Sequence, residues 1–280
     1  MAVDLAAQTL DLTGLQLTSG RLVLSGEAHG TQIQNAPAFQ GDLELAEFSP
    51  RALLQDLGLD APVTSDPAVL SKAAASFHLS STPDVVNLER LAVVLDDSRL
   101  DGQLKLRDPA QPAIRFDLKV DTIDLDRYLP PSADKAAQAP MPPAGLPADD
   151  APAAAPEPAP LFPVETLRQL DVQGVFRIGE LMIQKLKAQD VSLSLESQGG
   201  QLKLEDQVQR FYDGSLKGSF GLDVRGATPK LSIVQRLDKV QAGPLLADLS
   251  GKEQLTGTAR FNANLSASGY HTKAKGTYYF

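Results

Sequence analysis

The sequence has no cysteine and no tryptophan in its 280 residues, and only 5% of the residues are aromatic. Without cysteine no disulfide can stabilise the fold, and thiols give no indication of the redox compartment. Hydrophobic residues still make up 42% of the chain. A core is therefore expected, and it has to be mainly aliphatic, with leucine as its chief residue.

Long apolar runs and an excess of basic residues are also missing. No window approaches the roughly 20 apolar residues that a membrane-spanning helix needs, and the first residues do not resemble a signal peptide. Lys and Arg number 26 against 35 Asp and Glu, so the formal net charge is −9. This charge disfavours nucleic acid as a partner and adsorption to anionic headgroups through charge alone. Residues 5–17 already alternate like a strand, so we expect the chain to begin inside a larger protein.

Motifs for catalysis or metal binding are not found. The histidines at 29, 78 and 271 are scattered, and neither a G-x-S-x-G elbow nor a phosphate-binding loop occurs. The densest acidic cluster is Asp121, Asp124 and Asp126. It lacks the glycine and the distant glutamate of a helix-loop-helix calcium site. We therefore expect no catalytic residue, no metal site and no cofactor, and a protein that is not an enzyme.

Alternation of apolar and polar residues dominates what is present, most clearly over residues 89–131. A period of two places all apolar side chains on one face of a strand. Breaks fall at the turn-forming sequences of residues 96–98 and 108–109. The pattern predicts antiparallel strands with one apolar face and one polar face. The residues expected to form the apolar wall are Val93, Leu95, Leu104, Leu106, Phe116, Leu118 and Val120.

Similar strands are expected on both sides of this stretch, with short helices only near 50–57, 164–170 and 244–250. Ser49 and Pro50 suit a helix start, and Gly58 suits its end. The predicted fold is mainly β, a long curved antiparallel sheet with a few short helices. These helices are too few and too short to cover such a sheet. Two alternatives follow: the sheet closes on itself around a dry core, or it stays partly open and presents a long aliphatic groove.

The chain divides into four segments by composition. Residues 131–160 contain nine Pro and eleven Ala, which favours a disordered or polyproline-like linker. We expect a β-rich lobe at 1–130, a Pro/Ala-rich linker at 131–162 and a second β-rich lobe at 163–268. The tail at 269–280 is atypical, with three of the five Tyr in the chain.

Two short segments have similar copies later in the chain, and these internal similarities are called echoes below. Residues 53–57 (LLQDL) recur as 245–249 (LLADL), and 97–106 resemble 213–222. The offsets of 192 and 116 are unequal, which excludes one strict repeat period. The echoes reflect either shared hairpin and helix-cap chemistry or a sheet built by adding similar hairpins.

Several segments resemble the bacterial AsmA family, in the same order over residues 10–268. They are 48–58, 91–102, 114–118, 123–131, 190–193, 212–218 and 241–249. The Pro/Ala insertion is also typical of the family. The resemblance implies a Gram-negative envelope protein with an inner-membrane anchor, absent from this chain, and a β-rich periplasmic part. It also implies similarity to bridge-like lipid-transfer proteins, and no family catalytic residue.

The resemblance and the alternation together lead to the functional expectation. The chain is expected to be a periplasmic β-groove that binds or conducts phospholipid between the inner and outer membranes, with acyl chains on the apolar wall. The alternative is a non-enzymatic factor that assists outer-membrane protein assembly through its strand edges. The expected partners are phospholipid or another acyl-chain ligand, the inner membrane and outer-membrane proteins, with no nucleic acid.

Overall fold

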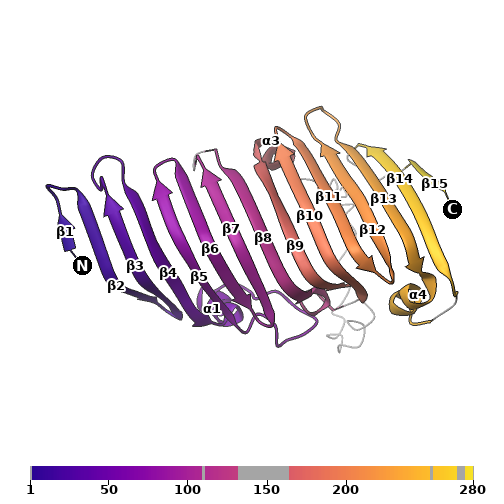
Figure 1. Ribbon diagram of the computed structural model, residues 1–280, viewed down its shortest axis with the longest axis horizontal. Helices are drawn as coiled ribbons and strands as arrows, with labels where there is room; N and C mark the ends of the chain where they lie inside the picture. Colours follow the sequence, from indigo (N-terminus) through magenta and orange to yellow (C-terminus); the bar gives the residue numbers. More distant parts are fainter. Residues whose placement is uncertain (1, 109–110, 132–163, 253–254, 270–274, 280) are drawn as a thin grey trace, which may run out of the picture.

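The residues that the structure describes form one sheet of fifteen strands, which follow one another in sequence order from β1 to β15 (Figure 1). The computed structural model describes residues 2–108, 111–131, 164–252, 255–269 and 275–279. The predicted fold class is confirmed: the fold is mainly β, curved, not closed and accompanied by a few short helices. Most of the predicted linker at 131–162 and part of the tail at 269–280 lie outside the described residues. The division into two lobes stays a prediction.

The first eight strands and their helices precede residue 131. The strands are β1 Ala2–Asp4, β2 Thr9–Ser19, β3 Leu22–Thr31, β4 Ala38–Phe48, β5 Ala73–Thr82, β6 Val85–Leu95, β7 Ser98–Arg107 and β8 Ala113–Asp124. The helices are α1 Pro50–Asp56 and the 3-10 turn η1 Leu125–Arg127. Ser49 caps α1 by accepting a hydrogen bond from the Ala52 amide at 3.3 Å, as its sequence predicts.

The remaining elements follow residue 163. The strands are β9 Asp171–Ile183, β10 Leu186–Gln198, β11 Gln201–Phe211, β12 Gly214–Asp223, β13 Lys230–Gln241, β14 Thr258–Ser268 and β15 Lys275–Tyr279. The helices are α3 Val164–Gln169 and α4 Ala242–Ser250, which ends at Gly251 with a φ of +74°. All three predicted helices are thus confirmed within one or two residues. The echoing segments 53–57 and 245–249 lie largely in α1 and α4, and both helices connect adjacent antiparallel strands.

The pairing of β8 with β9 is parallel, whereas every other neighbouring pair is antiparallel. Strand β8 ends near α1, and α3, which precedes β9, lies at the opposite end of the strands (Figure 1). The first residues of β8 and β9 therefore lie side by side, Ala113 opposite Asp171, and the two strands run in the same direction. Two ion pairs bridge this junction: Arg115 with Asp171 at 2.7 Å, and Arg177 with Asp117.

Registers between the strands align the apolar side chains in rows that run across the sheet. One row crosses from β2 to β14 through Leu12, Ala28, Gly41, Leu79, Leu88, Leu104, Phe116, Gly174, Leu195, Leu204, Phe220, Ile233 and Leu265. Parallel rows start at Leu10, Leu15 and Leu17, two or three residues apart along β2. One face of the sheet is therefore apolar over thirteen strands, and the other is polar.

Glycines in these rows make room for large neighbours to lie across the sheet. A Cβ atom at Gly174 would lie 2.5 Å from Cγ of Phe116, and one at Gly102 would lie 3.0 Å from Cδ2 of Leu118. Since real Cβ contacts are longer, neither position accepts a side chain without displacement of its neighbour. The aromatic and aliphatic side chains can therefore lie flat on the apolar face.

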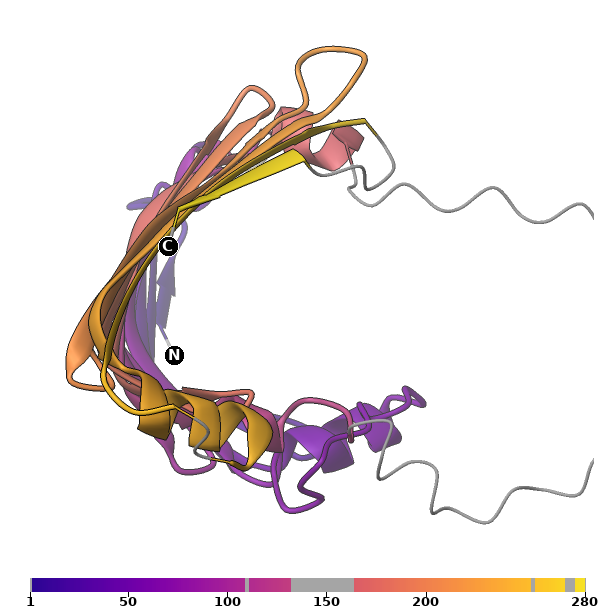
Figure 2. The same cartoon turned by 90° about the vertical axis from the view of Figure 1, so that its right-hand side faces the viewer.

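Curvature turns the sheet into a C-shaped cross-section (Figure 2). Helices α1 and α4 lie along the lower rim and α3 lies at the upper rim, all toward the open side of the C. Leu245 of α4 packs against a buried cluster of apolar-row residues and their neighbours: Val120, Ile178, Ala188, Val191, Val208, Phe211 and Val240. Because the helices pack on the apolar side, the apolar rows form the concave face and the polar residues form the convex face.

Candidate functional site

The concave face brings together all seven residues that the sequence singled out. Val93 and Val120 belong to the row that starts at Leu17, and the other five lie in neighbouring rows or beside them. Val120 is only 4% exposed because it belongs to the cluster near α4, while the other six are half-buried. The concave face is therefore buried only in part, and six of the seven predicted side chains remain partly accessible. Whether a lipid contacts them stays a prediction.

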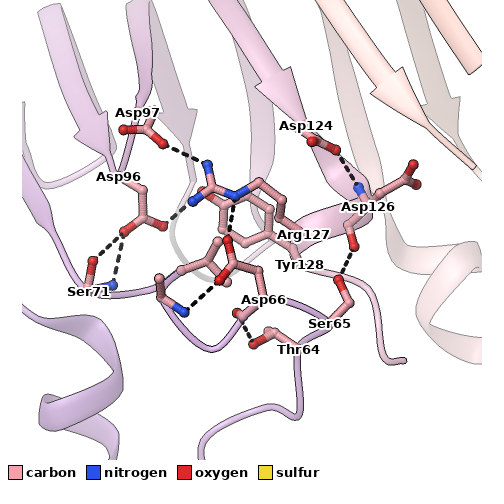
Figure 3. A network of polar contacts seen from close by, with 12 residues as sticks. Thr64, Ser65, Asp66, Ser71, Asp96, Asp97, Asp124, Asp126, Arg127 and Tyr128 are labelled. Carbon is pink, nitrogen blue, oxygen red and sulfur yellow. Dashed lines mark hydrogen bonds and ion pairs between the residues drawn. The ribbon is translucent and has the colours of Figure 1, made fainter. Parts of the chain in front are cut away.

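The lower rim of the concave face is held by a polar network that sequence reasoning did not identify (Figure 3). The Asp96 carboxylate accepts hydrogen bonds from the backbone amides of Leu70, Ser71 and Lys72 at 2.7–3.1 Å. It also accepts a hydrogen bond from the Tyr128 hydroxyl at 2.9 Å. Asp96 has a φ of +50°, in the tight turn between β6 and β7. One carboxylate thus connects a hairpin, η1 and the segment that follows α1.

Arg127 completes the network from η1. Its Nε donates to Asp66 at 2.8 Å, and its Nη1 donates to Asp97 at 2.6 Å. Backbone hydrogen bonds tie the same two segments together, because the Asp66 amide donates to the Arg127 carbonyl at 3.1 Å and the Ser65 amide donates to the Leu129 carbonyl at 2.8 Å. The segment between α1 and β5 is therefore fixed against the end of β8. The neighbouring residues Asp96 and Asp97, and likewise Arg127 and Tyr128, are visible in the sequence. The contact between these two pairs is not, because about 30 residues separate them.

Electrostatics of this network follow from its contacts. Burial by itself raises the pKa of Asp96, but the hydrogen bonds from Leu70, Tyr128 and Ser71 outweigh it and hold the pKa below its ordinary value. Burial and the hydrogen bond to Asp96 raise the pKa of Tyr128 to about 12. Since the folded-state pKa of Asp96 is lowered, its stabilising contribution is present at neutral pH and is lost as the pH falls through that value. The rim segment is therefore expected to loosen in acid.

A second, smaller contact of the same kind holds α4. The Tyr212 hydroxyl donates to Asp248 at 2.6 Å, and Lys187 lies 3.4 Å from the same carboxylate. Burial and this hydrogen bond raise the pKa of Tyr212 to about 12. One tyrosine–aspartate contact thus fixes α4 directly, and the other joins η1 to the turn that holds the segment after α1. Both contacts stabilise the same edge of the concave face.

Replacement of Asp96 with asparagine is expected to loosen the rim segment while leaving the sheet intact. A neutral amide cannot match the charged acceptor for three backbone amides, and such hydrogen bonds contribute about 1.5–3 kcal/mol. Hydrogen exchange of the amides at 70–72 should therefore accelerate about tenfold or more at pH 7. The matched control is Asp101→Asn, an exposed carboxylate that pairs with Arg99 on the convex face. Equal exchange in the two variants would contradict the role of Asp96.

The acidic cluster and two of the histidines have structural contacts. Asp121 accepts a hydrogen bond from the Arg99 amide at 2.8 Å, and Asp126 accepts one from the Lys185 amide at 2.6 Å. His29 and His78 lie on the convex face beside single aspartates. No group of three or more metal-ligating side chains occurs among the described residues, and His271 lies outside them. The carboxylates of the cluster instead fix strand ends and turns.

Hollows on the convex face lie between long polar side chains. One of about 1070 Å³ lies over β10 to β14, and its charged lining residues are Glu196, Lys203, Asp223 and Lys230. Lys203 is paired with Glu205 at 2.7 Å, and Asp223 is paired with Arg225 at 2.7 Å. The mixed signs and internal pairing give this hollow no distinct charge, so the concave face is the stronger candidate site.

Comparison with known proteins gives one match. The model of the AsmA family matches residues 4–275, nearly the whole chain. No curated protein and no solved structure matches the chain. Within the described residues, no helix combines the length and the hydrophobicity that crossing a membrane requires.

Proposed function

The chain belongs to the AsmA family, and from this membership and the concave apolar face we propose that it binds phospholipid and conducts it between the inner and outer membranes. Family membership supports a function associated with the cell envelope. The proposal places this chain in the periplasm, as part of a protein that is anchored in the inner membrane. It assigns the chain no catalytic step and no cofactor.

The observation that carries the proposal is the continuity of the apolar rows. Thirteen strands at about 4.8 Å spacing give a surface about 60 Å long, roughly twice the hydrocarbon thickness of a bilayer. This length exceeds that of one acyl chain, so several lipids could lie along it in series. A surface that only stored one lipid would not need such length, and the geometry therefore supports conduction as well as binding.

The chemistry of the face suits hydrocarbon better than a polar ligand. Its side chains are Leu, Val, Ile, Phe, Ala and Gly almost throughout. Each methylene that leaves water against such a surface contributes about 0.8 kcal/mol. The polar headgroup would lie where the face is open to water or where it carries polar side chains. A ligand that is apolar along its length and polar at one end matches this division.

Lipid extraction tests the proposal directly. The protein should be purified without detergent from bacterial cells that express it in their envelope, extracted with organic solvent, and analysed by mass spectrometry. We expect phospholipid in at least equimolar amount, and transfer of fluorescent phospholipid between vesicles when the protein is added. Protein that is folded by circular dichroism but neither carries nor exchanges lipid would overturn the proposal.

A second candidate function is assistance to outer-membrane protein assembly. The observation that favours it is the open sheet, whose terminal strands β1 and β15 each pair with only one neighbour among the described strands. Unpaired strand edges can template the pairing of another chain. Capture of unfolded outer-membrane proteins by folded protein that carries no lipid would support this function instead.

A further inference from the structure

One polar contact interrupts the concave face. In the four apolar rows of β2 to β14, Asp206 is the only charged residue and Gln235 is the only amide. They belong to the row that starts at Leu15, two strands apart, with Gly218 between them. Nε2 of Gln235 donates to Oδ1 of Asp206 at 3.0 Å. The contact is possible because a Cβ at Gly218 would lie 2.2 Å from that nitrogen.

Apolar side chains surround this pair on the same face. Leu204 and Val208 flank Asp206 along β11, and Ile233 and Leu237 flank Gln235 along β13. Within the described part of the chain, no Lys or Arg pairs with Asp206, and its Oδ2 accepts no hydrogen bond. An ionised carboxylate in apolar surroundings is costly unless a cation or hydrogen-bond donors compensate it. The protein supplies Asp206 with one amide and no cation.

Gln235 is also incompletely satisfied. Its Oε1 is buried and has no hydrogen-bond partner. A buried acceptor without a partner is costly, and real proteins depart from full satisfaction of polar groups mainly at functional sites. The amide lies flat against Gly218, which has no side chain to hold it in place. Rotation of the amide toward a donor on a ligand would satisfy Oε1 while Asp206 accepts a second donor.

We propose that Asp206 and Gln235 form a polar subsite on the concave face that binds the primary ammonium headgroup of a phospholipid. The inference rests on the proposed function, because it deepens the ligand preference of the same surface. A primary ammonium supplies both things that the pair lacks: a positive charge for Asp206 and several N–H donors for its Oδ2 and for Oε1 of Gln235. A headgroup with a quaternary ammonium supplies the charge without the donors, and a glycerol headgroup supplies donors without the charge.

Competition between lipids tests the subsite. The delipidated protein is incubated with vesicles of equal mole fractions of phosphatidylethanolamine, phosphatidylcholine and phosphatidylglycerol with the same acyl chains, and the bound lipid is quantified by mass spectrometry. We expect phosphatidylethanolamine to be enriched about fivefold or more over each competitor. Asp206→Asn should return the bound composition to that of the vesicles at unchanged total lipid. The matched control is Glu205→Gln on the convex side of the same strand, which should retain the enrichment.

The outcomes separate the two proposals. Lipid bound by the wild-type protein without enrichment, or enrichment that persists in Asp206→Asn, overturns the subsite and leaves the lipid-binding function standing. No bound lipid in the wild-type protein overturns both. If Asp206→Asn fails to fold, the wild-type preference for the primary over the quaternary ammonium decides the question, because both headgroups carry the same charge.

Discussion

Leu118→Asp is expected to abolish phospholipid binding while the sheet stays folded. Leu118 lies in the middle of β8, half-buried on the concave face, with its side chain over Gly102. A carboxylate at this position would have to be desolvated by any acyl chain that crosses it, and such a penalty amounts to at least a few kcal/mol. Bound phospholipid should fall by more than tenfold in mass spectrometry of the purified protein.

The neighbouring Lys119 provides the control for this variant. Lys119 lies on the same strand but faces the convex side, so Lys119→Asp introduces the same residue away from the apolar rows. It should leave lipid binding unchanged. Retention of lipid by a folded Leu118→Asp variant would contradict the assignment of the concave face as the binding surface. An unfolded variant would show instead that Leu118 belongs to the protein core.

Gly174→Ala is expected to destabilise the protein at the parallel junction of β8 and β9. A Cβ at Gly174 would lie 2.4 Å from the carbonyl oxygen of Phe116 and 2.5 Å from its ring. Strand β8 would have to shift, because the closest atom belongs to the backbone. Overpacking of this kind costs about 1–3 kcal/mol, and the junction is the one parallel pairing in the described sheet. The midpoint of urea unfolding should fall accordingly.

Gly226→Ala is the matched substitution for this measurement. A Cβ at Gly226 would come no closer than 3.9 Å to the backbone of Thr228, and Gly226 has no positive φ. The free energy of unfolding should change by less than about 0.5 kcal/mol. Equal stability of the two variants would show that β8 and β9 accommodate the methyl group, and that close packing at Gly174 does not stabilise the junction.

Prediction from the sequence succeeded where the signal is local. Alternation with period two placed Leu104, Phe116 and Leu118 on one face, because successive side chains of any strand point to opposite sides. Ser49 and Pro50 predicted the start of α1 through capping chemistry that involves only neighbouring residues. The Pro/Ala composition indicated where the run of strands is interrupted, and the next described residues begin α3.

Contacts between distant segments were not predictable in the same way. Asp96 and the amides of residues 70–72 are about 25 positions apart, and their contact depends on a turn with positive φ and on the path of the segment after α1. Alternation along β11 and along β13 puts Asp206 and Gln235 on the apolar face. Only the registers of β11, β12 and β13 bring the two residues together across Gly218.

The sequence by itself determined that this protein is a β-sheet with one apolar and one polar face, because that division follows from the pattern within each strand. Tertiary structure decided which face is concave, how the rows align across thirteen strands, and that β8 and β9 run parallel. These features depend on hydrogen-bond registers between strands and on the twist and bending that accumulate over the whole sheet, and no single strand carries them.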